Sequence, residues 1–333
     1  MEIKKINGLI LVIFTLYVAV SLVLGFYPEM FEIGVILNLS LGEILLGIPT
    51  VVYLLFWKMS CRRKREILPT GEEVWESEDC SLAKRLHFNR VKGSTVLYAM
   101  LFTWLSMPLT TLLNVISMLF VDNTVMALTD MIYEVAFPLM LFLMAVVPAV
   151  CEEVVFRGVV YGGYRKSGNK FVAVLLSGLL FGIMHMNLNQ ALYAFAIGVL
   201  LALLLEATNS IWVTMLFHFI YNAQSCCLMF LVEEMMPGYY SDPANTMPAP
   251  QQLYTMIAVY IIIAAVTTPL AICLLYKIAK NENRVEQLKE TLPGKGLQKE
   301  KLVTISLVLA IIVAFAFIVF DILLSAGIIT IPQ

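Results

Sequence analysis

The chain has 333 residues, of which 60% are hydrophobic and 14% are charged, and its formal net charge at pH 7 is −2. Soluble domains are about 45–50% apolar and about 25% charged, so this composition excludes an ordinary soluble protein. The apolar stretches are about 17–26 residues long, as in membrane-spanning helices, whereas barrel strands have about 10 residues of alternating polarity. We therefore predict an all-α, polytopic membrane protein with about eight to nine transmembrane helices.

Nine apolar stretches are candidate spans. They cover residues 6–27, 32–57, 93–121, 129–157, 171–187, 190–206, 210–232, 253–276 and 302–326. The fifth and sixth are short and nearly continuous, so they are also candidates for a hairpin that does not cross the membrane fully. Asn187 and Asn189 lie at their junction, and asparagine is a preferred helix-capping residue. We expect both to cap this turn.

The basic residues predict the orientation. All 22 Lys and Arg residues fall in four segments, which are the N-terminus, residues 58–92, the stretch from Arg157 to Lys170 and the stretch from Lys277 to Lys301. The alternating segments 28–31, 122–128, 188–189, 233–252 and 327–333 contain none. Because basic loops remain in the cytoplasm, we expect a cytoplasmic N-terminus, an external C-terminus and a location in the cell (plasma) membrane.

Two glutamates and an arginine lie inside the fourth span, as Glu152, Glu153 and Arg157. An ionised carboxylate in hydrocarbon is costly unless it is paired or hydrated, so intramembrane ionisable residues are functional candidates. The alternative is an interhelical charge cluster that only fixes packing. Glu43 lies deep in the second span, and we assign it no role beyond pairing with a polar group in the bundle or being protonated.

The helical spacing separates the two glutamates. Residues four apart share a helix face, so Glu153 and Arg157 are predicted to form an ion pair along one helix. Glu152 points about 100° away from Glu153 and lacks that partner.

Two of the three histidines of the chain lie in apolar spans. His185 follows Phe181 by four residues in the fifth span, and His218 precedes Asn222 by four residues in the seventh. At about 1.5 Å per residue, Glu152 lies about 20 Å from Arg165 and His185 about 22 Å from Lys170, so the two are at similar depth, and His218 is shallower. Taken alone, each histidine would be read as a satisfied core residue.

A glutamate, two histidines and an amide together can activate water. A carboxylate beside an imidazole can take a proton from water, and the resulting hydroxide equivalent can attack a carbonyl. A histidine and an asparagine on one helix face can donate to the oxyanion, which is often worth ~3–4 kcal/mol. Alternatively, Glu152, His185 and His218 are candidate ligands for Zn²⁺ with one position open for water. The sequence contains no HExxH motif, no serine elbow and no pair of intramembrane aspartates, which disfavours serine and aspartyl proteolysis.

Three motifs occur in order on separate spans: EExxxR at Glu152–Arg157, FxxxH at Phe181–His185 and HxxxN at His218–Asn222. This set resembles the CPBP family of intramembrane proteases (CAAX protease and bacteriocin-processing, also called Abi), which includes type II CAAX prenyl endopeptidases. The resemblance covers roughly residues 95–232. It implies peptide-bond hydrolysis at an active site within the helix bundle, reached from the cytoplasmic side.

The resemblance also implies roles for the motif residues. Glu152 would be the water-activating base with His185 as its partner, and the pair of Glu153 and Arg157 would orient the site. The HxxxN motif would hold the oxyanion, or ligate metal in the family's metalloprotease description. A Zn²⁺ cofactor and a metal-independent site both remain open at this point.

We predict three regions. Residues 1–92 hold two transmembrane helices and a cytoplasmic linker, residues 93–232 form the catalytic core, and residues 233–333 hold an external loop and two further helices. The expected partners are a membrane-associated protein or peptide substrate and the lipid bilayer, and not nucleic acid.

The resemblance implies CAAX-type processing, maturation of a bacteriocin or other peptide, or self-immunity. Two other functions fit the residues themselves. One is an ion- or proton-coupled transporter that uses the same Glu and His groups as a relay. The other is a catalytically silent membrane scaffold of the same fold.

Overall fold

The computed structural model describes residues 2–27, 34–60, 80–121, 123, 135–240, 248–295, 300–325 and 327–329, together with the backbone of residues 63–67 and 73–77. Within these residues, eight helices are long and apolar enough to cross a membrane. They are α1 (Glu2–Phe26), α2 (Val35–Ser60), α4 (Gly93–Ser117), a composite helix (Phe137–Ser167), α10 (Leu188–Thr208), α11 (Ile211–Met235), α13 (Pro250–Asn281) and α15 (Ile305–Ser325). The predicted helical, multi-pass membrane protein is confirmed.

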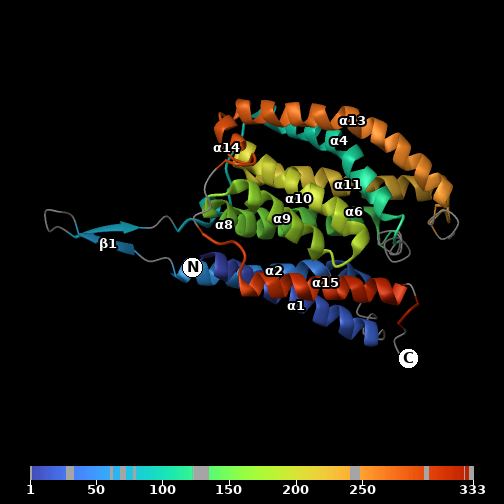
Figure 1. Ribbon diagram of the computed structural model, residues 1–333, viewed down its shortest axis with the longest axis horizontal. Coiled ribbons are helices and arrows are strands. Elements are labelled where there is room, and N and C mark those ends of the chain that lie inside the picture. Colours follow the sequence, from blue (N-terminus) through green and yellow to red (C-terminus); the bar gives the residue numbers. More distant parts are fainter. Residues whose placement is uncertain are drawn as a thin grey trace.

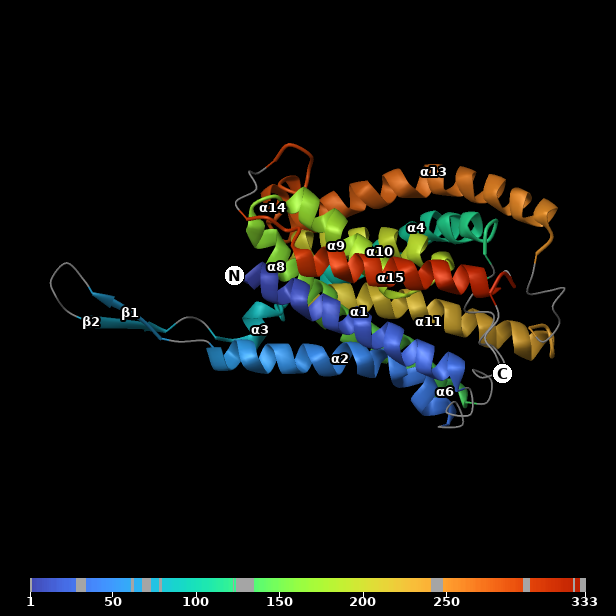
Figure 2. The ribbon, with the colours of Figure 1, turned by 60° about the horizontal axis from the view of Figure 1, so that its bottom comes forward.

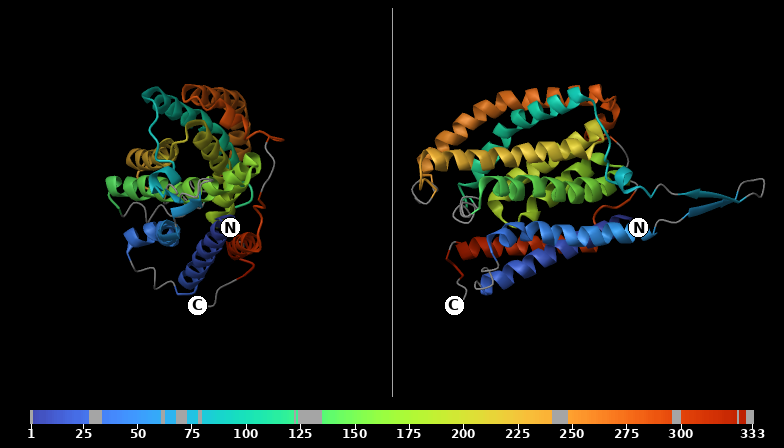
Figure 3. Two further views of the ribbon diagram at one scale, coloured as in Figure 1. Left: turned by 90° about the vertical axis from the view of Figure 1, so that its left-hand side faces the viewer. Right: turned by 180° about the vertical axis from the view of Figure 1, so that it is seen from behind.

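The helices form three layers (Figure 1). One outer layer consists of α1, α2 and α15, and the other consists of α4 and α13. Between them lie the composite helix, α9 (Lys170–Met184), α10 and α11. The same three layers are seen from behind (Figure 3, right), whereas in Figure 2 the helices α1 and α15 have come forward and lie in front of the middle layer. All three sequence motifs belong to the middle layer, so helices cover them on both faces.

The two ends of the bundle differ in charge. At one end α4, α9 and α11 begin and α10 and α13 finish, next to the short helix α14 (Val285–Lys289) (Figure 1). We call this the basic end, because Arg165, Lys170, Lys280 and Arg284 lie there. At the opposite end, α4 and α11 finish and α13 begins.

Helix α9 is shorter than the others. Its 15 residues extend about 22 Å at 1.5 Å per residue, which is less than the roughly 30 Å of a hydrocarbon core. It packs along α10 as the first arm of a hairpin, while α10, with 21 residues, is long enough to cross. The number of membrane spans is therefore eight when α9 is counted as one arm of a hairpin and nine when it is counted as a separate span.

The turn between α9 and α10 is capped by one of the two predicted asparagines. The side chain of Asn187 accepts a hydrogen bond from the backbone N–H of Gln190 at 2.8 Å, as predicted. The prediction for Asn189 is wrong. Its amide donates to Asn114 at 2.9 Å and to Ser117 at 3.0 Å, so it ties α10 to α4.

The composite helix differs from the predicted fourth span. It consists of α6 (Phe137–Leu141), η3 (Phe142–Val146), α7 (Val147–Glu153), η4 (Val154–Tyr161), α8 (Gly162–Tyr164) and η5 (Arg165–Ser167). The predicted start at residue 129 lies outside the described residues. The helix continues past the predicted end at 157, because the charge of Arg157 is paired inside the bundle. Segments η3 and η4 are π-helical and flank α7, and such wider turns often occur at functional sites.

A β-hairpin interrupts the helical chain between α2 and α3 (Leu82–Arg85). Strand β1 (Arg63–Ile67) pairs antiparallel with β2 (Glu73–Ser77), with Arg63 opposite Ser77. The hairpin projects beyond the basic end (Figure 1). It lies in the segment predicted as a linker and is the one departure from an all-α chain among the described residues. Shortly after it, Cys80 is disulfide-bonded.

The backbones of α9 and α10 approach closely at glycines. A Cβ on Gly198 would lie 2.7 Å from the Cα of Gly178, and a Cβ on Gly182 would lie 2.5 Å from the carbonyl oxygen of Ala191. Small residues spaced four apart permit such close helix packing in membranes. The contact fixes the height at which α9 ends, and therefore the position of His185 immediately after it.

We expect Gly198→Ala to lower the midpoint of thermal unfolding in detergent, because an extra methyl group in a close-packed contact costs about 1–3 kcal/mol. Gly47→Ala in α2 is the matched control, since a Cβ there meets no atom within 4 Å and Ala is favoured over Gly in helices by roughly 1 kcal/mol. A midpoint for Gly198→Ala at or above that of Gly47→Ala would contradict the close approach.

Candidate active site

One cavity brings together residues from all three motifs. Glu152 of α7, His185 after α9, and His218 and Asn222 of α11 line a cavity of about 480 Å³. Phe181 also lines it. These side chains are far apart in the sequence, so tertiary packing alone places a carboxylate, two imidazoles and an amide around one space.

Beside this cavity lies a buried ion pair. Glu153 and Arg157 are both 0% exposed, and Nη1 of Arg157 lies 3.0 Å from Oε1 of Glu153, as the four-residue spacing predicts. A second guanidinium nitrogen, Nη2, donates to the carbonyl oxygen of Gly198 at 3.4 Å. The guanidinium also stacks over the ring of Phe181 at 4.3 Å, a cation–π contact. The pair therefore joins the composite helix to both arms of the α9–α10 hairpin.

His218 lies between the two glutamates. Its Nδ1 is 3.1 Å from Oε1 of Glu153, and its Nε2 is 3.8 Å from Oε2 of Glu152. A carboxylate can only accept, so Nδ1 is the protonated nitrogen. The Glu153 carboxylate is held by Arg157 and thus fixes the orientation of the His218 ring, which presents its other nitrogen to Glu152.

His185 is oriented by the end of α9. Its Nδ1 lies 2.9 Å from the carbonyl oxygen of Phe181, so Nδ1 donates and Nε2 keeps its lone pair. The Phe181 ring packs edge-on against His185 at 5.4 Å and against His218 at 5.9 Å. The imidazole in contact with Glu152 is that of His218, whereas the resemblance implied His185. His185 lines the same cavity from another side.

A third carboxyl group reaches the site from the outer layer. The carboxyl group of Glu43 in α2 lies next to that of Glu152, and Oε2 of each has no hydrogen-bond partner. Two neighbouring carboxyl groups repel each other when both are ionised and can hydrogen-bond when one of them carries a proton. The sequence signalled Glu43 as a charge inside a span, but its partner could not be predicted because α2 lies outside the motif region.

The cavity extends from Glu152 toward the opposite end of the bundle. Asn114 near the end of α4, Asn123 beyond it, and Tyr240 beyond α11 also line it. Its lining also includes Gln190 and Gln224, whose amides can hydrogen-bond to a peptide backbone, and apolar side chains such as Met107 and Met144. The site is therefore a recess of mixed polar and apolar lining that is elongated along the helix axes.

The proposed zinc ligands have suitable chemistry but not suitable positions. Imidazole and carboxylate donors are typical of zinc sites. Within the described residues, however, no group of three His, Cys, Asp or Glu side chains comes close enough to hold a metal ion. Glu152, His185 and His218 therefore do not fit a three-ligand site in this arrangement.

The comparisons with known proteins concern the same part of the chain. Residues 134–224 match the family model described as "Type II CAAX prenyl endopeptidase Rce1-like". A segment of 101 residues is 36% identical to a Bacillus subtilis (strain 168) protein named "Putative membrane peptidase YdiL". That match covers 30% of this chain and 40% of the relative. No solved structure matches.

We expect Arg157→Met to lower the free energy of unfolding by about 3–5 kcal/mol, because it leaves the Glu153 charge buried without its partner. The double variant Glu153→Gln/Arg157→Met removes both charges and is expected to recover much of this loss. Thermal or denaturant unfolding in detergent measures both values. If the two substitutions were additive, the ion pair would not be the interaction that makes these buried charges tolerable.

Proposed function

Because residues 134–224 match the Rce1-like type II CAAX prenyl endopeptidase family model, we propose that this multi-pass membrane protein is an intramembrane endopeptidase. The shared cavity of Glu152, His185, His218 and Asn222 is the observation that supports it most directly. Its substrate would be a membrane-associated protein or peptide, and the reaction the hydrolysis of one peptide bond by an activated water molecule.

Glu152 acts as the base in this proposal. Its carboxylate takes a proton from a water molecule in the cavity, and the hydroxyl oxygen forms a bond to the carbonyl carbon of the scissile peptide. The bond between this carbon and the amide nitrogen then breaks, and the nitrogen leaves as an amine after receiving the proton from Glu152. The products are a carboxylic acid and an amine, so one water molecule is consumed for each bond.

The two motif histidines and Asn222 stabilise the reacting groups. The side-chain N–H of Asn222 and a protonated His218, supported by the Glu153 carboxylate at 3.1 Å, would donate to the oxyanion. Such donors are often worth ~3–4 kcal/mol in the transition state. The Nε2 lone pair of His185 would accept a hydrogen bond from the water and orient it.

Glu43 determines where the shared proton lies. When the proton is on Glu43, Glu152 is a carboxylate and can act as a base; when it is on Glu152, the site is inactive. Glu43 would thus be a positioning residue. It lies in the region 1–92, outside the proposed catalytic core of residues 93–232 and outside the flanking region of residues 233–333. Paired carboxyls that share one proton are a known way of giving two acidic groups different roles.

The proposed orientation places the basic end in the cytoplasm of the cell. All Lys and Arg residues fall in four sequence segments, and Arg165, Lys170, Lys280 and Arg284 of the described residues lie at this end, as the positive-inside rule expects of a cytoplasmic face. The disulfide at Cys80 favours the other orientation, since disulfides are rare in the reducing cytosol. Four separate basic segments are a stronger determinant of orientation than one disulfide bond.

We expect Glu152→Gln to abolish peptide hydrolysis by the purified protein while leaving its thermal unfolding midpoint close to that of the original, because Gln keeps the shape of Glu and removes the base. Loss of general-base catalysis lowers rates by about 10²–10⁴-fold. Glu286→Gln on α14 is the matched control, since Glu286 is 77% exposed. Hydrolysis that persists in Glu152→Gln would refute the assigned mechanism.

For Glu43→Gln we expect a smaller loss. The amide can hydrogen-bond to Glu152 but cannot exchange a proton with it, so the proton affinity of Glu152 should fall, and a loss of roughly 1.4 kcal/mol in that affinity would lower kcat about tenfold. The pH dependence of kcat should also shift, which a purely structural role would not produce. An unchanged pH profile together with an unchanged kcat would show that Glu43 has no part in the reaction.

A further inference from the structure

The axis of the cavity indicates where a substrate enters. On α4 its lining runs from Met107 to Asn114, and on the composite helix it runs from Glu152 back to Met144. Because α4 and the composite helix run in opposite directions, both series proceed from the level of Glu152 toward the opposite end. They cover seven and eight residues, or about 10 to 12 Å at 1.5 Å per residue.

Helix α11 shows the same direction. Its lining begins at His218 and continues through Ser225 to Met229, about 16 Å further toward the opposite end at 1.5 Å per residue. Tyr240, beyond the end of α11, also contributes. Three helices thus form a passage from the level of Glu152 to the end of the bundle opposite the basic end. The sequence segments that we assign to this opposite end contain no Lys or Arg.

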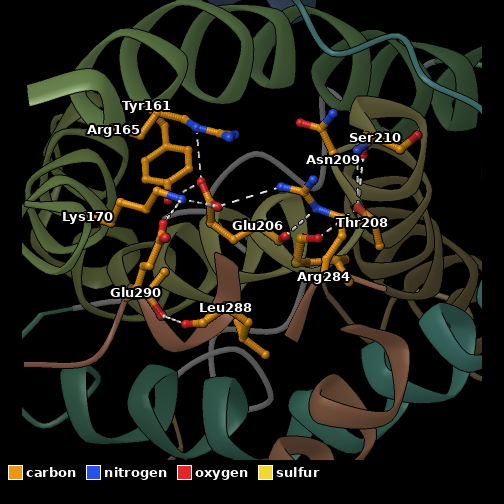
Figure 4. A network of polar contacts seen from close by, with 12 residues as sticks. Tyr161, Arg165, Lys170, Glu206, Thr208, Asn209, Ser210, Arg284, Leu288 and Glu290 are labelled. Carbon is orange, nitrogen blue, oxygen red and sulfur yellow. Dashed lines mark hydrogen bonds and ion pairs between the residues drawn. The ribbon is translucent and has the colours of Figure 1, made fainter. Parts of the chain in front are cut away.

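The basic end is closed by an ion network (Figure 4). The carboxylate of Glu206 is 0% exposed and lies 3.1 Å from Arg165 and 3.0 Å from Lys170, while Arg284 donates to the Glu206 backbone carbonyl oxygen at 2.8 Å. Tyr161 donates to the same carboxylate at 3.0 Å. These residues belong to the composite helix, α9, α10 and the segment before α14, so the network joins four parts of the chain across this end.

A second contact closes the space beneath the network. The backbone N–H of Ile211 donates to the carbonyl oxygen of His87 at 2.9 Å, and Asn89 donates to the carbonyl oxygen of Asn209 at 2.7 Å. Burial lowers the pKa of His87 to about 4, with the positive charge of Arg165 adding to the effect. The segment between α3 and α4 is thus fixed against the turn between α10 and α11.

The packing between this seal and the catalytic level is tight. A Cβ on Gly158 would lie 2.6 Å from Leu86, and Leu86, Gly158 and Ile211 are all buried. Within the described chain, none of these residues or those labelled in Figure 4 is among the residues that line the cavity. The structure therefore provides a passage with polar and apolar lining on one side of Glu152 and a packed seal on the other.

We propose that the substrate reaches Glu152 through the opposite end of the bundle, which the positive-inside rule places outside the cytoplasm. This inference rests on the proposed peptidase function and names its substrate class: an extended segment of a membrane-anchored protein or peptide whose scissile bond lies in the outer half of the membrane or just beyond it. The Asn, Gln and Tyr side chains of the lining provide donors and acceptors for such a backbone. A prenylated cytoplasmic C-terminus would arrive at the sealed end, so this proposal replaces the cytoplasmic access that the family resemblance implied.

The test uses the full-length protein in cells, with all six natural cysteines replaced by Ser or Ala. Ser225→Cys places one thiol in the passage, and Lys289→Cys on α14 places one at the basic end, where Lys289 is exposed. A charged, membrane-impermeant methanethiosulfonate is applied to intact cells and, separately, to permeabilised cells. Mass spectrometry of the purified protein reports labelling, and peptide hydrolysis is measured afterwards.

We expect Ser225→Cys to be labelled in intact cells and to lose hydrolysis on labelling, whereas Lys289→Cys is labelled only after permeabilisation and keeps its activity. Labelling of Ser225→Cys only after permeabilisation, or in neither condition, would overturn the proposal. Labelling of Lys289→Cys in intact cells would also overturn it, because the basic end would then face outward. The labelling readout needs no catalysis, so a failure of the peptidase function would appear separately, as hydrolysis that Glu152→Gln does not change.

Discussion

The guanidinium of Arg157 is completely buried, and its contacts hold the middle layer together. It forms an ion pair with Glu153, donates to the backbone of α10 at Gly198 and stacks on Phe181 of α9. Each of these partners positions a different group of the site. Glu153 orients His218, Phe181 packs against both histidines, and the close contact at Gly198 sets the relative height of α9 and α10. A buried charge that would otherwise be costly in a membrane is thus stabilised by the same contacts that position the site.

The buried charges also explain why Glu152 differs from its neighbour. Glu153 is neutralised within its own helix by Arg157, so it is available only as a structural anion. Glu152 points into the cavity, where it meets His218 on one side and Glu43 on the other. Of the two adjacent glutamates it is the one that lines the cavity, which is why the proposed mechanism assigns the base to it and a proton-sharing role to Glu43 of the outer layer.

The two ends of the bundle are built from different interactions. At the basic end, Glu206 forms ion pairs with Arg165, Lys170 and Arg284 (Figure 4). This network joins helices of the middle layer to the C-terminal region. At the opposite end, the space between α4, the composite helix and α11 is lined by amides and phenols. Ion pairs between helices hold chain segments together at one end, whereas at the other end the cavity leaves space between the helices. The proposed direction of substrate access rests on this difference.

The sequence by itself determined the helical membrane fold, most of the spans, the Glu153–Arg157 pair and the identity of the motif residues, because length, hydropathy and four-residue spacing are local properties. Only the tertiary structure decided that His218 and not His185 contacts Glu152, that Glu43 joins the site from α2, that Asn189 ties α10 to α4, and that the cavity runs away from the basic end. These features depend on how far one helix is shifted or rotated against another. That geometry is set by contacts such as Gly178 against Gly198, between residues whose proximity no local pattern encodes.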